Sequence, residues 1–236
     1  MNNSYYETLD ENFTQALKLY EQDYSHEELI KLLESGNIVQ KQIAALRLEG
    51  INSDSDADIL ISNLTGQDGK IREAVSLRLN EFMGQEQFLK FFKNKNHYQT
   101  YLDAVIDINA NICRNVICAI SNLKTDEEFC NIFCKKLTDL TFNLLDKIET
   151  FNFQDGKYKV NKEVFKLYWC LETIYEFYNK VKFNDLKQIL LRSKNIEEYT
   201  IREKAAKILS LGFEDPDLKR AQAELKNDRN YYVRRF

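Results

Sequence analysis

The two residue types that most often interrupt regular structure are scarce in this chain. Among 236 residues, proline occurs once and glycine seven times. An antiparallel sandwich or barrel needs turn residues at intervals of roughly 8–12 positions, so this scarcity argues against an all-β fold. Apolar residues make up 44% of the chain, which is enough for one sizeable core or one extended stack of repeats. The composition therefore predicts helices joined by short polar turns.

Long apolar runs are also missing. No run approaches the roughly 18 residues that are needed to cross a bilayer. The first residues, from Met1 to Glu7, lack the basic start and the apolar stretch of a signal peptide. We therefore expect a cytoplasmic protein that has no membrane partner.

The residues and motifs of common catalytic sites are few. Histidine occurs only at His26 and His97, and neither has a cysteine or a second histidine at ligand spacing. The chain contains no glycine-rich phosphate loop, no G-x-S-x-G and no H-E-x-x-H. The acidic run at 54–58 lacks the glycine and the terminal glutamate of an EF-hand loop. We expect no metal, no cofactor and no enzymatic activity.

The five cysteines are odd in number, lie among apolar residues and form no C-x-x-C motif. This pattern predicts buried free thiols in a reducing compartment. They are Cys113, Cys118, Cys130, Cys134 and Cys170.

The net charge of −4 is unevenly distributed along the chain. Residues 1–70 carry 5 Lys+Arg against 13 Asp+Glu, residues 71–200 carry 19 against 18, and residues 201–236 carry 9 against 6. The resulting charges are −8, +1 and +3, which predicts ends of different electrostatic character. The basic excess at the C-terminal end is too weak for the strong patch that nucleic-acid binding requires.

Apolar residues recur at spacings of three and four through most of the chain, which is typical of amphipathic helices. Two longer helices are predicted within 125–182, the second from about Asn161 to Lys180. The shorter helices are expected at about 7–21, 25–35, 38–49, 56–64, 70–83, 98–108, 110–123, 186–192, 199–211 and 216–227.

Several short motifs mark where these helices begin and end. Ser25 and Thr125 each open the pattern of a capping box, and Asp215 followed by proline fits a helix start. Gly36 suits a left-handed helix end. Gly212 is well placed to end the helix before Asp215.

A repeated sequence motif within the helical regions is the most informative indication of the fold. Residues 71–79 (IREAVSLRL) line up with 201–209 (IREKAAKIL), and 40–48 (QKQIAALRL) match the first of these 31 residues earlier. Val233-Arg234 follows Ile201-Arg202 by 32 residues, and 113–118 (CRNVIC) form a weaker instance. The first, fifth and ninth positions share one helix face and are expected to pack on the preceding helix.

In two occurrences of this motif, an acidic residue stands four positions before the basic residue. Asp68 precedes Arg72 and Glu198 precedes Arg202 at this spacing. Such pairs on a helix surface contribute a few tenths of a kcal/mol, and more where they bridge repeats.

This repeated motif resembles the second helix of a HEAT or HEAT-like repeat, best at 201–212 and next best at 71–79. The resemblance implies an all-α solenoid, a right-handed superhelix of antiparallel helix pairs with two longer helices in the middle, whose second helices line a concave face. Such proteins usually bind other proteins. A helical bundle without superhelical order is the alternative.

The same resemblance gives a domain plan, a single solenoid domain over 1–236. Its clearest repeats are 25–50, 55–83, 98–123 and 183–212, with a divergent long pair at 125–182 and an incomplete terminal repeat at 215–236.

The candidate contact residues follow from helix geometry. Phe165 and Trp169 lie on the half of the long helix that should be polar, bounded by charged residues. Either a neighbouring segment covers this aromatic pair, or it is an exposed anchor for a partner, since tryptophan is enriched at binding hot spots. The other candidates are solvent-side residues of second helices: Gln42, Glu73, Asn115 and Glu203.

We therefore expect a non-catalytic scaffold or adaptor that binds another protein. One alternative is nucleic-acid binding; another is a lyase or chaperone subunit, by fold analogy alone. The terminal repeat at 230–236 is expected either to self-associate through an open apolar edge or to be covered by its own aromatic tail. The residues that could meet phosphates are Lys204, Lys207, Lys219, Arg220, Arg229, Arg234 and Arg235.

Overall fold

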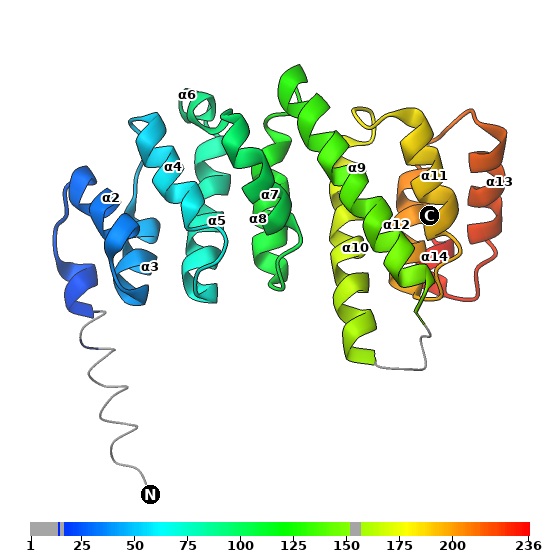
Figure 1. Cartoon of the computed structure of the whole chain (residues 1–236), viewed down its shortest axis with the longest axis horizontal. Coiled ribbons are helices and arrows are strands. Elements are labelled where there is room, and N and C mark those ends of the chain that lie inside the picture. Colours follow the sequence, from blue (N-terminus) through cyan, green and yellow to red (C-terminus); the bar gives the residue numbers. More distant parts are fainter. Residues whose placement is uncertain (1–13, 15–16, 152–156) are drawn as a thin grey trace, which may run out of the picture. The chain divides into compact units, whose positions relative to one another are not determined.

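The computed structural model describes residue 14, residues 17–151 and residues 157–236, and all regular structure within them is helical. The chain divides into two compact units, Met1–Thr100 and Tyr101–Phe236. The boundary falls inside α7 (Tyr98–Val105). Each unit is a stack of helix pairs, the all-α architecture of a helical solenoid (Figure 1). The prediction of one continuous domain stays a prediction.

In the N-terminal unit, two helix pairs stack in order. The first helices of the pairs, α2 and α4, pack on each other, and so do the second helices, α3 and α5. The elements are α2 (His26–Ser35), α3 (Ile38–Arg47), α4 (Asp54–Ser62), α5 (Gly69–Met83), α6 (Glu86–Leu89) and the 3-10 turns η1 (Lys90–Phe92) and η2 (Lys95–His97).

In the C-terminal unit the same two rows of helices recur. The first helices α9, α11 and α13 pack in sequence, and the second helices α8, α10, α12 and α14 form the other row. The elements are α8 (Ala110–Ser121), α9 (Glu127–Glu149), α10 (Lys157–Phe177), α11 (Phe183–Ser193), α12 (Tyr199–Leu209), α13 (Pro216–Leu225) and α14 (Tyr231–Arg234).

Most predicted helix ends agree with the structure. Ser25 forms the capping box of α2, Asp215 caps α13 with proline at its start, and Gly212 follows α12 with φ +87°. The two long helices are present as α9 and α10. The turn of helix formed by α6, and the two 3-10 turns after it, were not predicted. The predicted helix at 7–21 lies largely outside the described residues.

Two predicted caps are wrong. The N-cap of α9 is Asp126, one residue later than Thr125. Gly36 is extended, with φ −70° and ψ 166°, because only Gly36 and Asn37 separate two helices and Asn37 already caps the second. A Cβ atom at Gly36 would lie 2.8 Å from the Cβ of Gln40 and would clash with the Leu32 carbonyl. Close approach, and not a left-handed φ, is what requires glycine there.

The repeated basic residue has a structural role: it binds the loop before its own helix. It stands four residues after the N-cap, at Arg72, Arg202 and Arg234. Arg202 donates to the Ile196 carbonyl at 2.9 Å and to that of Glu197. Arg234 and Arg72 donate in the same way to loop carbonyls. These carbonyls precede the helix and have no partner within it, so the arginine satisfies them.

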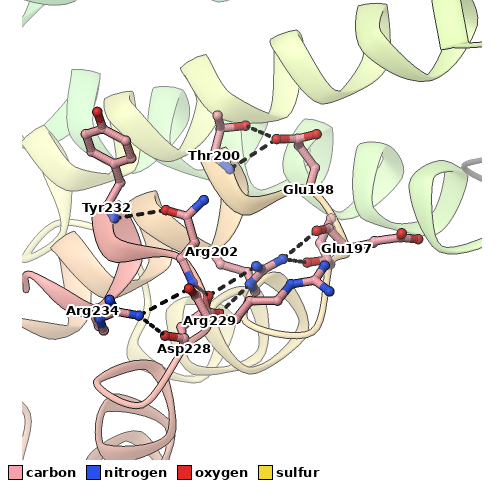
Figure 2. Close-up of polar contacts among 10 residues, drawn as sticks. Glu197, Glu198, Thr200, Arg202, Asp228, Arg229, Tyr232 and Arg234 are labelled. Atoms are coloured by element: carbon pink, nitrogen blue, oxygen red, sulfur yellow. Dashed lines mark hydrogen bonds and ion pairs between the residues drawn. The ribbon is translucent and has the colours of Figure 1, made fainter.

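Arg202 also joins two repeats. Its Nε lies 2.7 Å from Oδ2 of Asp228, in the loop between α13 and α14 (Figure 2). Both side chains are nearly buried, at 9% and 10% exposure. The predicted pairing of Arg202 with Glu198 is therefore wrong, since Glu198 caps α12 instead. A buried, bidentate pair between repeats constrains the stack far more than a surface pair does.

A second arginine recurs ten residues after the N-cap of α3 and of α5, and each binds carbonyls of a segment earlier in the N-terminal unit. Arg78 donates from Nε to the Ala45 carbonyl at 3.1 Å and from Nη2 to the Leu46 carbonyl. Arg47 binds the Tyr20 and Gln22 carbonyls in the same way. Each arginine thus caps the free C-terminal carbonyls of the preceding segment.

Replacing Arg202 by methionine should destabilise the chain by about 3 kcal/mol, because Asp228 would be left nearly buried without its partner. Denaturation by urea measures the free energy of unfolding. The matched control is Arg220→Met, which removes an exposed pair with Asp217 and should have little effect. Equal effects of the two substitutions would contradict a structural role for the Arg202 pair.

The same pair should make stability depend on acid pH. Hydrogen bonds from Arg202 lower the pKa of Asp228 below its ordinary value of 3.8, although burial opposes the shift. A lowered folded-state pKa contributes stability above pH 3.8 that is lost as the pH falls through the folded-state value. The stability difference between the wild type and Asp228→Asn should therefore be large at pH 7 and shrink below about pH 4. A difference that stayed constant down to pH 2 would contradict this assignment.

Candidate functional site

Three of the six predicted contact residues occupy one repeat position, the fifth after the N-cap of a second helix. Gln42 and Glu73 hold this position in the N-terminal unit and Glu203 holds it in the C-terminal unit. All three are partly exposed. Glu203 accepts a hydrogen bond from Arg235, the residue at the same position of α14, at 2.6 Å. The position therefore faces the neighbouring second helix along the row.

Asn115 does not occupy this position, and Arg114 does. The N-cap of α8 is Asn109, so the fourth residue after it is Cys113, whose thiol donates to the Asp107 carbonyl at 3.1 Å as the arginines do elsewhere. The sequence prediction aligned Arg114 with Arg72 because both are arginines. That alignment shifted the repeat positions of α8 by one residue and put Asn115 in the place of Arg114. Sequence reasoning missed that Arg114 holds this repeat position, and the N-cap asparagine is the signal that locates it.

Trp169 is buried, with 4% of its surface exposed. Its ring contacts Phe165 and Tyr168 edge to face, at centroid distances of 6.1 and 5.2 Å. The guanidinium of Arg114 lies over the ring at 5.7 Å. Of the two possibilities for Trp169, coverage by a neighbouring segment is the one found, because α8 packs on this side of α10. Phe165 remains partly exposed.

An open groove runs between α8 and α10, and it is named here the Trp169 groove. It consists of two hollows of about 330 and 390 Å³ that share Arg114, Tyr168 and Trp169. The first continues along α8 and α10 to Ser121 and Glu176. The second is lined further by Ala110, Asn161, Val164, Phe165, Glu198 and Thr200.

Two groups beside the groove have unused hydrogen-bonding capacity. Nε1 of Trp169 is closed to solvent and has no hydrogen-bond partner among the described residues, which is uncommon for an indole N–H. Arg114 donates to Oδ1 of Asn111 at 3.2 Å and, within the described residues, forms no ion pair. Its guanidinium is a donor only. Arg114 is therefore the donor that the groove offers to a ligand with carbonyl or carboxylate oxygens.

Two of the acidic residues that line the groove are already neutralised. Glu172 accepts hydrogen bonds from Lys204 and from Lys207, the latter at 2.9 Å. Burial alone would raise the pKa of Glu172, but these bonds lower it below its ordinary value. Glu176 pairs with Lys124 at 2.7 Å. The third, Glu198, caps α12 and, like Arg114, forms no ion pair within the described residues.

Most of the predicted phosphate-binding residues are paired with carboxylates. Lys204 and Lys207 share Glu172, while Arg235 binds Glu203. Lys219 pairs with Glu214 and Arg220 pairs with Asp217. Only Arg229 and Arg234 form no ion pair among the described residues.

Nucleophilic groups are also constrained by their surroundings. Burial raises the pKa of the thiols of Cys113, Cys134 and Cys170 to about 12. Cys130 is buried as well, whereas Cys118 is exposed, contrary to the prediction that all five are buried. His26 and His97 each bond an aspartate of α4, at 2.8 and 2.6 Å.

Two further findings concern the described residues alone. They contain no group of three or more His, Cys, Asp or Glu side chains placed to hold a metal ion. None of their helices combines the length and the apolar character that crossing a membrane demands.

Comparison with known proteins finds similarity at the level of solved structures. No family model matches the sequence, and no curated protein matches it. Two engineered proteins of a structural genomics consortium align over 90% of this chain, covering 93% and 95% of their own, at 14% and 17% identity with TM-scores of 0.47 and 0.48. A designed armadillo repeat protein aligns over 89% of this chain and 96% of its own, at 13% identity and a TM-score of 0.46. These likenesses concern the path of the chain alone.

The one tryptophan of the chain makes the groove directly observable by fluorescence. Arg114→Ala should increase the quenching of Trp169 by acrylamide, because the guanidinium no longer covers the ring. The loss of a cation–π contact costs only about 0.5–1 kcal/mol, so the variant should remain folded. Arg220→Ala, on α13, should leave the quenching unchanged. Identical quenching in both variants would show that Arg114 does not shield the indole.

Proposed function

We propose that this chain is a non-catalytic interaction scaffold of the HEAT type, and that it binds an extended segment of another protein in the Trp169 groove. The observation that supports this proposal is an open groove over Trp169, edged by Arg114, whose guanidinium forms no ion pair among the described residues. The helical repeats support the HEAT assignment, because each repeat here has two helices, whereas an armadillo repeat has three.

The dimensions and composition of the groove suit a polypeptide. The part of α10 that lines it, residues 161–176, extends about 22 Å at about 1.5 Å per residue. An extended segment of about six or seven residues has the same length. Tryptophan, tyrosine and arginine, which edge both hollows, are the residues most enriched at protein-binding hot spots.

The donor of the groove defines what the segment must supply. Arg114 requires acceptors, which backbone carbonyls or an acidic side chain provide. Partly exposed Phe165 offers its ring to an apolar side chain beside that acceptor. The bound segment is therefore extended, with an apolar residue next to an acidic one.

Nucleic acid is the less favoured ligand. Five of the seven basic side chains considered for phosphate binding already form ion pairs with carboxylates. The phosphates of a nucleic acid would have to displace these carboxylates. The displaced carboxylates would stay nearby and repel the negatively charged phosphates.

A peptide-display selection tests the proposal. Short random peptides are selected on the intact chain, and binding is then measured by the change in Trp169 fluorescence. Arg114→Glu should weaken the selected peptides at least tenfold, which is about 1.4 kcal/mol, because it reverses the charge at the groove. The control Arg220→Glu reverses an exposed charge on α13 and should bind as the wild type does.

Two results would contradict the proposal. One is a set of peptides that bind the wild type and Arg114→Glu equally. The other is a selection in which no peptide alters the fluorescence of Trp169.

A further inference from the structure

A cluster of exposed tyrosines lies away from the Trp169 groove, where the start of α12 meets α14. Tyr199, Tyr231 and Tyr232 are 38%, 65% and 52% exposed. The ring of Tyr232 lies 6.4 Å from that of Tyr199 and 5.8 Å from that of Tyr231. In Figure 2 the ring of Tyr232 points away from the polar contacts around Arg202. The three rings thus form a preorganised aromatic surface that the described residues leave open.

Two arginines beside these rings keep their charges unpaired. Arg229 is exposed and forms no ion pair in the described part of the chain. Arg234 is exposed too, and its guanidinium donates only to the Asp228 and Arg229 carbonyls. The nearby Asp228 is neutralised by Arg202. Tyr199, Tyr231, Tyr232, Arg229 and Arg234, named here the Tyr–Arg patch, therefore form an aromatic surface that carries two arginine charges on its α14 side.

The composition of this patch is that of a protein interface. Tyrosine and arginine are enriched in interfaces and at their hot spots, because both bury large areas and make directed polar contacts. Its positive charge selects an acidic partner.

The same chain carries a surface of the complementary kind. Residues 1–70 have 5 Lys+Arg against 13 Asp+Glu, a charge of −8. Their described segment 17–23 exposes 47% of Leu17 and 64% of Tyr20, and Glu21 and Asp23 are exposed beside them. Arg47 holds the backbone of this segment by bonds to the Tyr20 and Gln22 carbonyls. Apolar and acidic groups thus lie together on an anchored segment.

We propose that the Tyr–Arg patch binds the acidic segment 17–23 of a second copy of this chain. Leu17 and Tyr20 of one copy cover the exposed rings of the other, and Glu21 and Asp23 pair with Arg229 and Arg234. One such contact leaves one surface of each kind free on the pair. These free surfaces pair either with each other, which closes a dimer, or with further copies, which extends a row.

Sedimentation velocity on the full chain tests this proposal. The wild type at concentrations up to about 100 μM should form concentration-dependent dimers or larger oligomers. These should dissociate toward the monomer between about 0.1 M and 1 M salt, as the Debye length falls from about 10 Å to about 3 Å.

Two variants each remove one side of the contact. Tyr231→Ala/Tyr232→Ala removes the rings but keeps the backbone N–H that Asn230 caps, and Glu21→Lys/Asp23→Lys reverses the acidic charges. Each variant alone should be monomeric. Mixed together they should form a one-to-one pair and nothing larger, because only one productive contact remains. Circular dichroism confirms that both are folded.

Matched controls separate this contact from other surfaces. Tyr178→Ala removes a tyrosine of 37% exposure outside the patch and should leave the oligomers unchanged. Arg114→Glu should also leave them unchanged, so a failure of the peptide-binding proposal and a failure of this one are distinguishable.

Two outcomes would overturn the proposal. The first is a wild type that stays monomeric over the whole concentration range at low salt. The second is a mixture of the two variants that forms no pair.

Discussion

Each helix pair of this fold brings loop carbonyls next to a packed second helix, and those carbonyls must be satisfied. Arg202 shows the solution in full, since one guanidinium binds two carbonyls of its own loop and a carboxylate of the next repeat. An unpaired buried carbonyl would cost about as much as a lost hydrogen bond. The recurring basic residue is therefore a structural requirement of the stack, and the next repeat is held in place by the same side chain.

The surface available for recognition is what these structural contacts leave over. Arg72, Arg202 and Arg234, each the fourth residue after an N-cap, bind the loop before their helix, whereas Lys41 of α3 binds the side chain of Asn63. In α12 and α14 the fifth residues, Glu203 and Arg235, form an ion pair. In α8 the fifth residue is Arg114, which lies over the ring of Trp169. The groove thus lies where a fifth residue contacts aromatic residues of α10 and not a carboxylate.

Charge pairing also explains why net charge is a poor guide to ligands here. The excess of +3 over residues 201–236 suggests a basic surface, yet most of those side chains are bound by carboxylates of the same unit. Lys204 is only 8% exposed and lies between Glu172 and the ring of Tyr168. What distinguishes Arg114, Arg229 and Arg234 is not their charge but the absence, in the described residues, of a carboxylate partner.

The sequence by itself determined the helices, most of their caps and the position of the repeated basic residue. These are local properties: apolar spacing follows the helical period, and Ser25 or Asp215 caps a helix through bonds to its own first turn. The tertiary structure alone decided which residues are covered and which are paired. Trp169 is buried because α8 lies against it, and Arg202 binds Asp228 across 26 positions of sequence. Burial and pairing between helices depend on which faces meet, and no spacing within one helix specifies that.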